Sequence, residues 1–356
     1  MARIIYGVQG EGRGHSSRSK IIIEHLLQQG HDVKIFTSHK GYDYLSTIFD
    51  DVTNILGLGF VFDGGKLDIS KTLQQNLQDG TIDAGKTMYL LYKTFKEFQP
   101  HLAITDFEPF VPYLKGLGNI PFLSINHQHI ISQYHLEYPY KWRADYLRAK
   151  TIVDNMYWFA DHYYVTSFYY PRAREMFRKK STLIPPILRN EVQDRKLADN
   201  GPILIYATTT DARMVLDVVQ KTKYQYIGYG FDEGSGTKGN ITFKKTGTGE
   251  FLDDLASAAA VVTNGGYTLM SEAICLGKPV YSIPIRRQFE HMVNGYYLEK
   301  LGFGLYDLVP IRKRFLMFLE GLPYYRKNMR NDHSRRQGNT RLFKALDRKI
   351  EEIRLP

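Results

Sequence analysis

Apolar residues along this chain follow two patterns, short unbroken runs and longer segments in which they recur at helical spacing. The run Arg3–Val8 (RIIYGV) is rich in β-branched residues, as in a strand that is buried on both faces. The segment Ser16–Gln29 carries its apolar residues on one helical face and stops at Gly30, a residue type that commonly ends helices. Asp32–Thr37 (DVKIFT) is a second strand-like run. Strand, helix and strand in this order predict a βαβ unit with parallel strands.

The same alternation continues along the chain in two series, which Pro185, Pro186 and a polar stretch separate. We therefore predict an α/β fold with two doubly wound, Rossmann-like domains that face each other across a cleft. We assign residues 1–188 to the N-terminal domain, 189–200 to a linker, 201–335 to the C-terminal domain and 336–356 to a basic C-terminal helix. The other predicted strands are Leu102–Thr105, Pro121–Asn126, Tyr163–Thr166, Thr182–Ile184, Ile203–Ala207, Tyr224–Ile227, Ile241–Phe243, Ala259–Thr263 and Val280–Ile283.

Composition narrows the class of protein. The 356 residues are 43% hydrophobic and 24% charged, which excludes a disordered, collagen-like or coiled-coil chain. No apolar run approaches the roughly 18 residues of a membrane-spanning helix, and no signal-peptide segment precedes the first strand. Cys275 is the only cysteine, so an internal disulfide is excluded. We expect a cytoplasmic protein that associates at most peripherally with the inner face of a membrane.

The positive charge is concentrated near the C-terminus. Residues 312–354 contain 13 basic and 5 acidic residues, whereas the whole chain has a net charge of +10. Such a segment could bind an anionic membrane surface or, as a less favoured partner, the phosphates of nucleic acid. It could equally be a solvated helical surface.

Aromatic residues cluster in one segment. Residues 134–170 contain 13 aromatics among 37 residues, about 35%, against 13% for the whole chain. Core and interdomain packing is the simpler explanation, and a platform for an acceptor sugar or a lipid surface is the functional one.

A first glycine-rich turn follows the first strand. Gly10–His15 has the sequence GEGRGH, which does not match the GxGxxG fingerprint of dinucleotide-binding folds. His15 and Asp106 each follow a predicted strand, so both should lie at the carboxyl edge of the first sheet, where α/β folds bind ligands. An Asp that accepts a hydrogen bond from one imidazole nitrogen prepares the other nitrogen to act as a general base. Alternatively, each residue only caps a helix.

A second glycine-rich turn, Thr263–Thr268, follows an apolar run and opens a predicted helix. Backbone N–H groups and the helix dipole favour an anion at such a position. Thr268 could add a hydroxyl to a diphosphate, and Glu272, four residues further on, would share its helix face. A carboxylate there could accept both hydroxyls of a ribose. A surface position for Glu272 is the alternative.

The next predicted strand leads into PIRRQFEHM, residues 284–292. Gln288, Glu290 and His291 could hydrogen-bond sugar hydroxyls, while Arg286 and Arg287 could neutralise phosphate or simply face solvent. The histidines of the segment 127–135 lack accompanying cysteine or carboxylate ligands, so we expect no metal site and no resident cofactor.

The two turns together resemble the GT-B nucleotide-sugar glycosyltransferases. The resemblance is carried by GEGRGHSSR (Gly10–Arg18) and by TNGGYTLMSEAICLGKPVYSIPIRRQFEHMVNGYYLEKLGFG (Thr263–Gly304). The branch that contains the UDP-glucuronosyl and plant UDP-sugar transferases and the peptidoglycan lipid I N-acetylglucosaminyltransferase is the most similar. In this family the acceptor binds mainly the N-terminal domain, the nucleotide sugar mainly the C-terminal one, and a C-terminal helix usually crosses back to the N-terminal domain.

The resemblance also implies roles for individual residues. His15 would be the general base and Asp106 its partner, and the loop around them would contact acceptor or phosphate through Gly12, Arg13, Gly14 and Arg18. The implied donor-binding residues are Asn264, Gly265, Gly266, Tyr267, Thr268, Glu272, Gln288, Glu290 and His291. Two departures from the family pattern stand out. Asn264 occupies the place of a phosphate-binding histidine, and His291 that of a glutamine.

The resemblance implies metal-independent, inverting transfer from a UDP-sugar to an acceptor hydroxyl, with the uracil near Phe243–Leu252. The basic C-terminal segment and the aromatic segment together favour a lipid or lipid-linked glycan as the acceptor. The alternatives are a DNA-modifying glucosyltransferase, a catalytically silent nucleotide-sugar binder and, less favoured, a UDP-sugar 2-epimerase.

Overall fold

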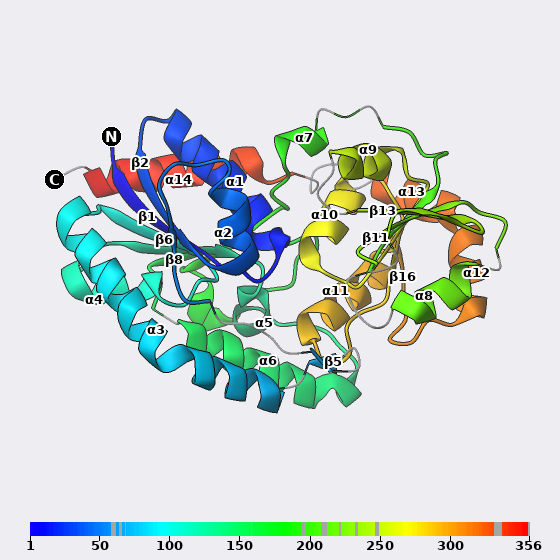
Figure 1. The fold of residues 1–356 in the computed structure, drawn as a ribbon, viewed down its shortest axis with the longest axis horizontal. Coiled ribbons are helices and arrows are strands. Elements are labelled where there is room, and N and C mark those ends of the chain that lie inside the picture. Colours follow the sequence, from blue (N-terminus) through cyan, green and yellow to red (C-terminus); the bar gives the residue numbers. More distant parts are fainter. Residues whose placement is uncertain are drawn as a thin grey trace.

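The fold is described from a computed structural model of the chain. It covers residues 1–57, 62–63, 66–67, 69–157, 159–193, 195, 197–207, 212–220, 222–231, 234–245, 249–330 and 337–354. Within these residues two seven-stranded sheets form the centres of two α/β domains, which lie side by side in Figure 1. The predicted fold class is therefore confirmed.

The N-terminal sheet has the strand order β3-β2-β1-β6-β7-β8-β9, and all of its neighbouring strands are parallel. The chain begins on the central strand, moves outward, and then returns to the other side of β1. The strands are β1 (Arg3–Val8), β2 (Asp32–Thr37), β3 (Val52–Asn54), β6 (Leu102–Asp106), β7 (Phe122–Asn126), β8 (His162–Thr166) and β9 (Ser181–Ile184).

Helices and short turns of helix connect these strands. A separate small hairpin consists of β4 (Phe62–Asp63) and β5 (Lys66–Leu67). The α-helices are α1 (Arg13–Gln28), α2 (His39–Leu45), α3 (Ile69–Phe98), α4 (Leu114–Gly118), α5 (His129–Gln133), α6 (Arg143–Met156) and α7 (Asn190–Gln193); the 3-10 turns are η1 (Val111–Tyr113), η2 (Tyr140–Trp142) and η3 (Glu175–Phe177).

The C-terminal sheet has the order β12-β13-β11-β10-β14-β15-β16, and only β12 runs antiparallel to its neighbour. Its strands are β10 (Ile203–Tyr206), β11 (Tyr226–Tyr229), β12 (Gly236–Lys238), β13 (Ile241–Lys244), β14 (Val261–Thr263), β15 (Val280–Ser282) and β16 (Gly304–Tyr306). The helices that follow in chain order are α8 (Ala212–Val219), α9 (Glu250–Ser257), α10 (Tyr267–Cys275), α11 (Phe289–Lys300), α12 (Arg312–Glu320) and α13 (Leu322–Arg330).

The structure shifts an end of three predicted elements, α1, β11 and β14, by two residues or more, and an end of most other predicted strands by one residue. Helix α1 begins at Arg13 rather than Ser16, because the extended Gly12 already caps it, so His15 lies in its first turn. Strand β11 spans Tyr226–Tyr229 and includes Gly228, whereas the predicted strand was Tyr224–Ile227. A Cβ at Gly228 would lie 3.1 Å from both Phe231 and Phe243, so the strand uses glycine for space.

The final helix, α14 (Asn339–Arg354), packs on the N-terminal domain (Figure 1). Its buried Leu342, Leu346 and Ile350 join the core that contains the β1 side chains Ile4 and Tyr6. Asp347 accepts a hydrogen bond from His25 of α1 at 2.7 Å. The chain thus passes from the N-terminal to the C-terminal domain and back.

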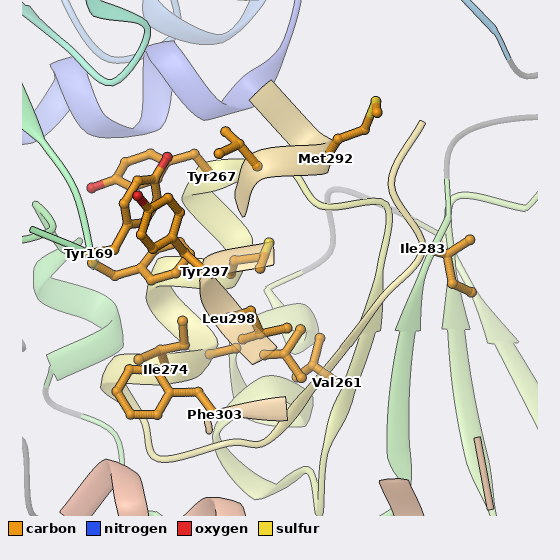
Figure 2. Packing of buried hydrophobic residues seen from close by; sticks show 14 of the residues in the cluster. Tyr169, Val261, Tyr267, Ile274, Ile283, Met292, Tyr297, Leu298 and Phe303 are labelled. Atoms are coloured by element: carbon orange, nitrogen blue, oxygen red, sulfur yellow. The ribbon is translucent and has the colours of Figure 1, made fainter. Parts of the chain in front are cut away.

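Aromatic side chains of the two domains meet at the contact between them, and Figure 2 shows Tyr169, Tyr267 and Tyr297 close together. Tyr169, which follows β8, stacks on Tyr297 of α11 with ring centroids 4.1 Å apart. Phe289 of α11 meets Tyr138 and Tyr146 edge to face. Most of the aromatic segment at residues 134–170 is therefore packing, although Tyr140 is 82% exposed.

Candidate active site

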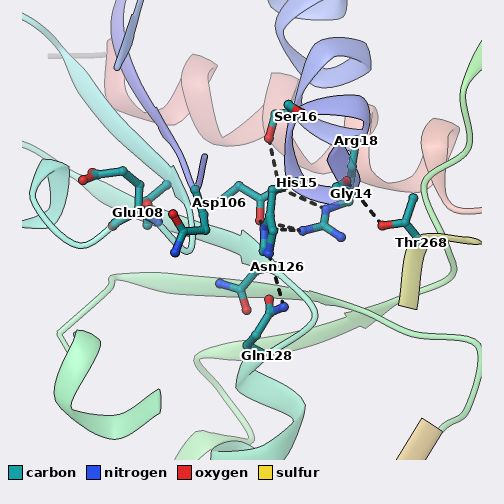
Figure 3. Close-up of polar contacts among 12 residues, drawn as sticks. Gly14, His15, Ser16, Arg18, Asp106, Glu108, Asn126, Gln128 and Thr268 are labelled. Atoms are coloured by element: carbon teal, nitrogen blue, oxygen red, sulfur yellow. Dashed lines mark hydrogen bonds and ion pairs between the residues drawn. The ribbon is translucent and has the colours of Figure 1, made fainter. Parts of the chain in front are cut away.

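His15 and Asp106 meet at the point where the strand order of the N-terminal sheet reverses. Asp106 is the last residue of β6, next to β1, and His15 lies in the first turn of the helix that follows β1. His15 Nδ1 lies 2.8 Å from Asp106 Oδ1, and the carboxylate is fully buried while the imidazole is 18% exposed (Figure 3). With Nδ1 donating to Asp106, Nε2 keeps its lone pair and faces away from the carboxylate.

Two residues of α1 also donate hydrogen bonds to the Asp106 carboxylate. Arg18 Nη2 donates to Oδ1 at 2.6 Å, Arg18 Nε to Oδ2 at 3.1 Å, and Ser19 Oγ to Oδ2 at 2.9 Å. Burial by itself would raise the pKa of Asp106, but the charges of Arg18 and His15 keep it below its usual value. Arg18, which the sequence assigned to an acceptor or phosphate loop, is instead buried, because the helix turns its side chain toward β6.

Gln128 connects the histidine to the C-terminal domain. Its Nε2 lies 3.4 Å from His15 Nε2 and donates to Glu290 Oε2 at 3.1 Å. Its Oε1 is buried and has no hydrogen-bond partner among the described residues, and the same is true of Gln288 Oε1. Because buried amide oxygens normally accept a hydrogen bond, both are suited to receive hydroxyl donors of a ligand.

The second glycine loop lies against the first. It follows β14, and Gly266 caps α10 in an extended conformation. Gly265 has a φ of +85°, and a Cβ there would lie 2.9 Å from the carbonyl oxygen of His291. Thr268 Oγ1 donates to the carbonyl oxygen of Gly14 at 3.3 Å, so the N-terminus of α10 opens toward the His15 turn (Figure 3).

A buried polar bridge fixes this loop to the N-terminal domain. Asn294 of α11 donates to the carbonyl of Gly265 at 3.1 Å and accepts from the Tyr169 hydroxyl at 3.1 Å. His127 Nε2 lies 2.9 Å from Asn294 Oδ1, and its ring stacks on Tyr267 at 3.9 Å. Burial lowers the pKa of His127. The Tyr267 ring, assigned by sequence to the donor site, is therefore an interdomain contact.

Glu272 lies one turn beyond Thr268 and is 2% exposed. Arg189, in the predicted linker, donates to both of its carboxylate oxygens, from Nε at 2.7 Å and from Nη2 at 2.8 Å. A surface position for Glu272 is thus excluded. A ribose at this carboxylate would have to share it with Arg189.

The other predicted residues lie around these two loops. Arg13 is exposed and lies over the Tyr44 ring, with 5.8 Å between the guanidinium carbon and the ring centroid. Burial lowers the pKa of His291, which also hydrogen-bonds the backbone of Asn264. The predicted uracil region, residues 243–252, lies partly outside the described residues. No group of three or more His, Cys, Asp or Glu side chains arranged to hold a metal occurs in the described part of the chain.

Comparison with known proteins identifies the family. The model of glycosyl transferase family 1 matches residues 2–323, which is most of the chain. The chain belongs to this family. It is therefore a glycosyltransferase, and its two domains have the GT-B arrangement.

The relatives of this glycosyltransferase are distant. It is 22% identical over 344 residues to an uncharacterized glycosyltransferase of Methanosarcina acetivorans, with 85% of this chain and 84% of that protein aligned. An uncharacterized glycosyltransferase of Methanosarcina mazei is 22% identical over 330 residues, with the same coverage.

Solved structures share its fold over the whole length. CalG4, the calicheamicin glycosyltransferase, matches with a TM-score of 0.69 and 14% identity over 100% of both chains. Arabidopsis thaliana UGT89C1 complexed with UDP-L-rhamnose matches with 0.68 and 15% identity over 99% of both. The glycosyltransferase VinC in complex with dTDP matches with 0.65 and 14% identity over 98% of this chain and 100% of that one.

Sequence reasoning missed two side chains of this candidate site. Gln128 lies in the segment 127–135, which the sequence analysis considered only for metal binding, and nothing in the sequence pairs it with Glu290. Arg189 lies in a stretch interpreted as a polar linker. Gln128 and Arg189 bind partners that are 162 and 83 residues away in the sequence, so no local sequence pattern predicts these contacts.

Proposed function

We propose that this glycosyltransferase moves a sugar from a nucleoside diphosphate sugar to an acceptor hydroxyl with inversion at the anomeric carbon. His15 is the general base, Asp106 its partner, and uridine diphosphate the default leaving group. The reaction requires no resident cofactor.

One observation supports this proposal above the others. In the His15–Asp106 pair, His15 Nε2 lies 3.4 Å from Gln128, which donates to Glu290, and the side-chain oxygens of Gln128 and Gln288 are buried with no hydrogen-bond partner among the described residues. A sugar carries the hydroxyl donors that these oxygens lack, and an acceptor hydroxyl within reach of Nε2 would have a base for its proton.

The proton transfer follows from the hydrogen bonds. As the acceptor oxygen attacks the anomeric carbon, its proton passes to His15 Nε2, and the imidazolium that forms is stabilised through Nδ1 by Asp106. Arg18 keeps Asp106 ionised, because it lowers the pKa of the carboxyl against the effect of burial. A base of this kind contributes about 10²–10⁴ to the rate.

The departing diphosphate would lie at the second glycine loop. The bond from the anomeric carbon to the diphosphate oxygen breaks, and the negative charge that develops there faces the N-terminus of α10. Gly265 and Gly266 permit close approach of the backbone, and the Thr268 hydroxyl can turn from Gly14 to a phosphate oxygen. Glu272 is proposed to accept the ribose hydroxyls beside Arg189.

Nucleotide binding is the step to test first. Thermal unfolding of the purified chain is followed with UDP, TDP, GDP, ADP and NAD in parallel. A ligand at 100 times its dissociation constant adds about 2.7 kcal/mol to the free energy of unfolding. A rise in Tm with UDP alone supports the proposal in full, and a rise with TDP alone changes the donor base. No rise with any of the five overturns it.

For the acceptor, we propose a lipid or a lipid-linked glycan, because one surface combines exposed apolar and basic side chains. Helix α12 exposes Leu316 and Met317 at 37% and 50% beside Arg312 and Lys313, and Tyr324 of α13 is 61% exposed. Helices of the described residues are all too short or too polar to cross a bilayer, so contact would be peripheral. Flotation with anionic and with neutral vesicles tests this, and equal binding to both overturns it.

A DNA acceptor, suggested by the same charge, predicts that transfer requires DNA and falls steeply with added salt. A protein that binds nucleotide sugars without catalysing transfer would bind the nucleotide but show no turnover. Substitution of His15 would then change no measured activity. The family assignment leaves epimerisation without support.

A further inference from the structure

Gln128 occupies the nitrogen that the proposed mechanism needs as a base. With His15 Nδ1 donating to Asp106, the Gln128 amide donates from Nε2 to His15 Nε2 across 3.4 Å (Figure 3). The same amide nitrogen also donates to Glu290 Oε2, which lies 3.1 Å away on the C-terminal domain. A neutral imidazole has a single acceptor nitrogen, and Gln128 uses it. An acceptor hydroxyl that gives its proton to His15 must therefore first displace the amide.

The hydrogen bond between Gln128 and His15 is weak enough to be displaced. Its length of 3.4 Å exceeds that of most protein hydrogen bonds, which span roughly 2.7–3.2 Å. An acceptor that is bound through its other groups can replace this bond, because its remaining contacts compensate for the loss. A single water molecule has no such contacts. An amide at this position can therefore distinguish an acceptor hydroxyl from water.

Both neighbours of Gln128 in the chain are fixed by hydrogen bonds. His127 is fully buried, and its Nδ1 donates to the carbonyl oxygen of Thr166 at 2.7 Å. His129 is 2% exposed, and both its backbone N–H and its Nδ1 donate to Asn126 Oδ1 at 3.0 Å. The backbone of Gln128 is thus held on both sides, so displacement by a ligand would be confined to its side chain.

The amide oxygen of Gln128 provides a separate indication of a ligand. The side chain is 9% exposed, and Oε1 is buried without a hydrogen-bond partner among the described residues. Buried amide oxygens normally accept a hydrogen bond, so the present position uses the donors of the amide and leaves its acceptor unused. A ligand hydroxyl can supply the missing bond, and a turn of the amide toward it would release His15 Nε2.

We propose that Gln128 covers the base His15 until an acceptor binds, and thereby directs the sugar to the acceptor hydroxyl instead of water. The proposal rests on the proposed function, because it takes His15 Nε2 as the base. In the side reaction that Gln128 suppresses, a water oxygen bonds to the anomeric carbon and the bond from this carbon to the diphosphate breaks. One water proton passes to His15 Nε2, and free sugar and UDP are the products. Gln128 is thus a positioning residue that selects the nucleophile.

The chemical reactivity of His15 tests this cover directly. Diethyl pyrocarbonate acylates the unprotonated nitrogen of an accessible imidazole, and peptide mass spectrometry follows each histidine separately. At pH 7, Q128A should react at His15 about two- to tenfold faster than wild type, the range that corresponds to the loss of one hydrogen bond. The control Q28A replaces an exposed glutamine on the same helix as His15 and should react as wild type does. An unchanged rate at His15 in Q128A overturns the proposal.

Two further readouts separate the cover from a loss of structure. The buried His127 and His129 should stay unmodified in every variant, because they react only if the segment around residue 128 unfolds. Q128M keeps a side chain of similar length but has no N–H to donate, so His15 should again react faster than in wild type. If Q128M protects His15 as wild type does, or if both variants expose His127 and His129, the proposal is overturned.

The choice of nucleophile is measured in the absence of an acceptor. UDP-glucose, UDP-galactose and UDP-N-acetylglucosamine are incubated with the full chain, and the release of UDP is recorded. Q128A should release UDP several-fold faster than wild type, whereas a merely structural defect would slow the release. The double variant H15A/Q128A should lose this gain, because water then has no base. If Q128A releases UDP from none of the three faster than wild type does, the selection of the nucleophile is overturned.

Failure of this proposal and failure of the proposed function give different results. If no nucleotide raises Tm but His15 reacts faster in Q128A, the proposed function fails and the cover remains. If UDP raises Tm and His15 reacts equally in Q128A and wild type, the cover fails and the proposed function remains.

Discussion

Arg189 binds both carboxylate oxygens of Glu272, although 83 residues separate them in the chain. The arginine follows the last strand of the N-terminal sheet, and the glutamate lies on the helix that follows the second glycine loop. The pair therefore ties the connection between the domains to the proposed ribose site. Burial alone would lower the pKa of Arg189, but the charge of Glu272 raises it, so the guanidinium remains charged.

Replacing Arg189 with methionine should destabilise the protein by about 3–5 kcal/mol, because a buried carboxylate then loses its counter-charge. Combining R189M with E272Q should recover part of this loss, since no buried charge is left unpaired. Urea unfolding of wild type, both single variants and the double variant gives the coupling free energy. Purely additive losses would show that the two side chains do not depend on each other.

Replacing His15 with alanine should lower the rate of sugar transfer by about 10²–10⁴ and leave UDP binding unchanged. In the described part of the chain the imidazole hydrogen-bonds Asp106, Arg18 and Gln128, none of which belongs to the second glycine loop, so loss of the imidazole should not affect nucleotide binding. Release of UDP in the presence of the acceptor found by screening measures the rate. The exposed His135 provides the control, and H135A should behave as wild type.

Asp106 is a less informative position for the same question. Its removal would leave the buried Arg18 guanidinium without this carboxylate as counter-charge, so D106A should lower stability as well as rate. A slow but normally stable H15A variant is therefore the clearer evidence for a base. An H15A variant with full activity would contradict the mechanism.

The two glycines of the second loop should respond differently to alanine. G265A should cost roughly 1–3 kcal/mol of stability, because its φ of +85° is strained for alanine and the Cβ would meet His291. G266A, whose φ is −62° and whose Cβ would have nothing nearer than His291 Nε2 at 3.9 Å, should cost less than about 1 kcal/mol.

UDP binding then tests the loop itself. A methyl group at Gly266 would stand where a phosphate approaches the backbone, so G266A should bind UDP more weakly although it remains folded. Calorimetric titration of wild type and G266A makes the comparison. Unchanged affinity would mean that the diphosphate does not approach this part of the loop.

Glu108 should make stability depend on pH. It is 3% exposed, accepts N–H groups of Phe110 and Val111, and burial raises its pKa from 4.5 to about 7. Between these values the folded protein holds a proton that the unfolded chain has released. Its contribution to stability is therefore complete below pH 4.5 and is lost as the pH rises to 7, by about 3 kcal/mol in total.

The variant E108Q removes this contribution. From pH 4.5 to 7, the unfolding free energy of wild type should fall by about 3 kcal/mol relative to that of E108Q. Above pH 7 the difference between the two proteins should stay constant. Buried histidines such as His129, whose pKa burial lowers to about 3, act in the opposite direction in both proteins and cancel. The control E175Q, at an exposed position, should have the same dependence of unfolding free energy on pH as wild type. If E108Q also has the same dependence as wild type, Glu108 does not cause the loss of stability.

The sequence predicts those features that depend on local pattern. Parallel order follows from alternating runs and helices, and His15 and Asp106 come together because parallel strands end at the same edge of a sheet. Strand β1 has the predicted bounds, since an apolar run ends there at a glycine turn. Strands β3 (VTN) and β16 (GLY) escape prediction because neither forms an apolar run, whereas β14 and β15, which are equally short, lie in apolar runs that the sequence shows.

Contacts between the domains could not be predicted in this way. Gln128 with Glu290, Thr268 with Gly14 and Arg189 with Glu272 all depend on how two rigid bodies pack, and neither partner's surroundings in the sequence reflect the other. The basic tail shows the same limit. The composition of residues 312–354 indicates a positive charge but not where it lies. The structure places α12 and α13 on the C-terminal domain and α14 on the N-terminal domain.

The position of α14 affects how the molecule can be made. Its Leu342, Leu346 and Ile350 complete the core beneath β1, which is synthesised before the whole C-terminal domain. The N-terminal domain therefore starts to be synthesised before the C-terminal domain and is completed after it. A fragment that stops at residue 188 would expose the apolar surface that this helix covers, and a separately expressed N-terminal domain would have to carry residues 337–354 joined to it.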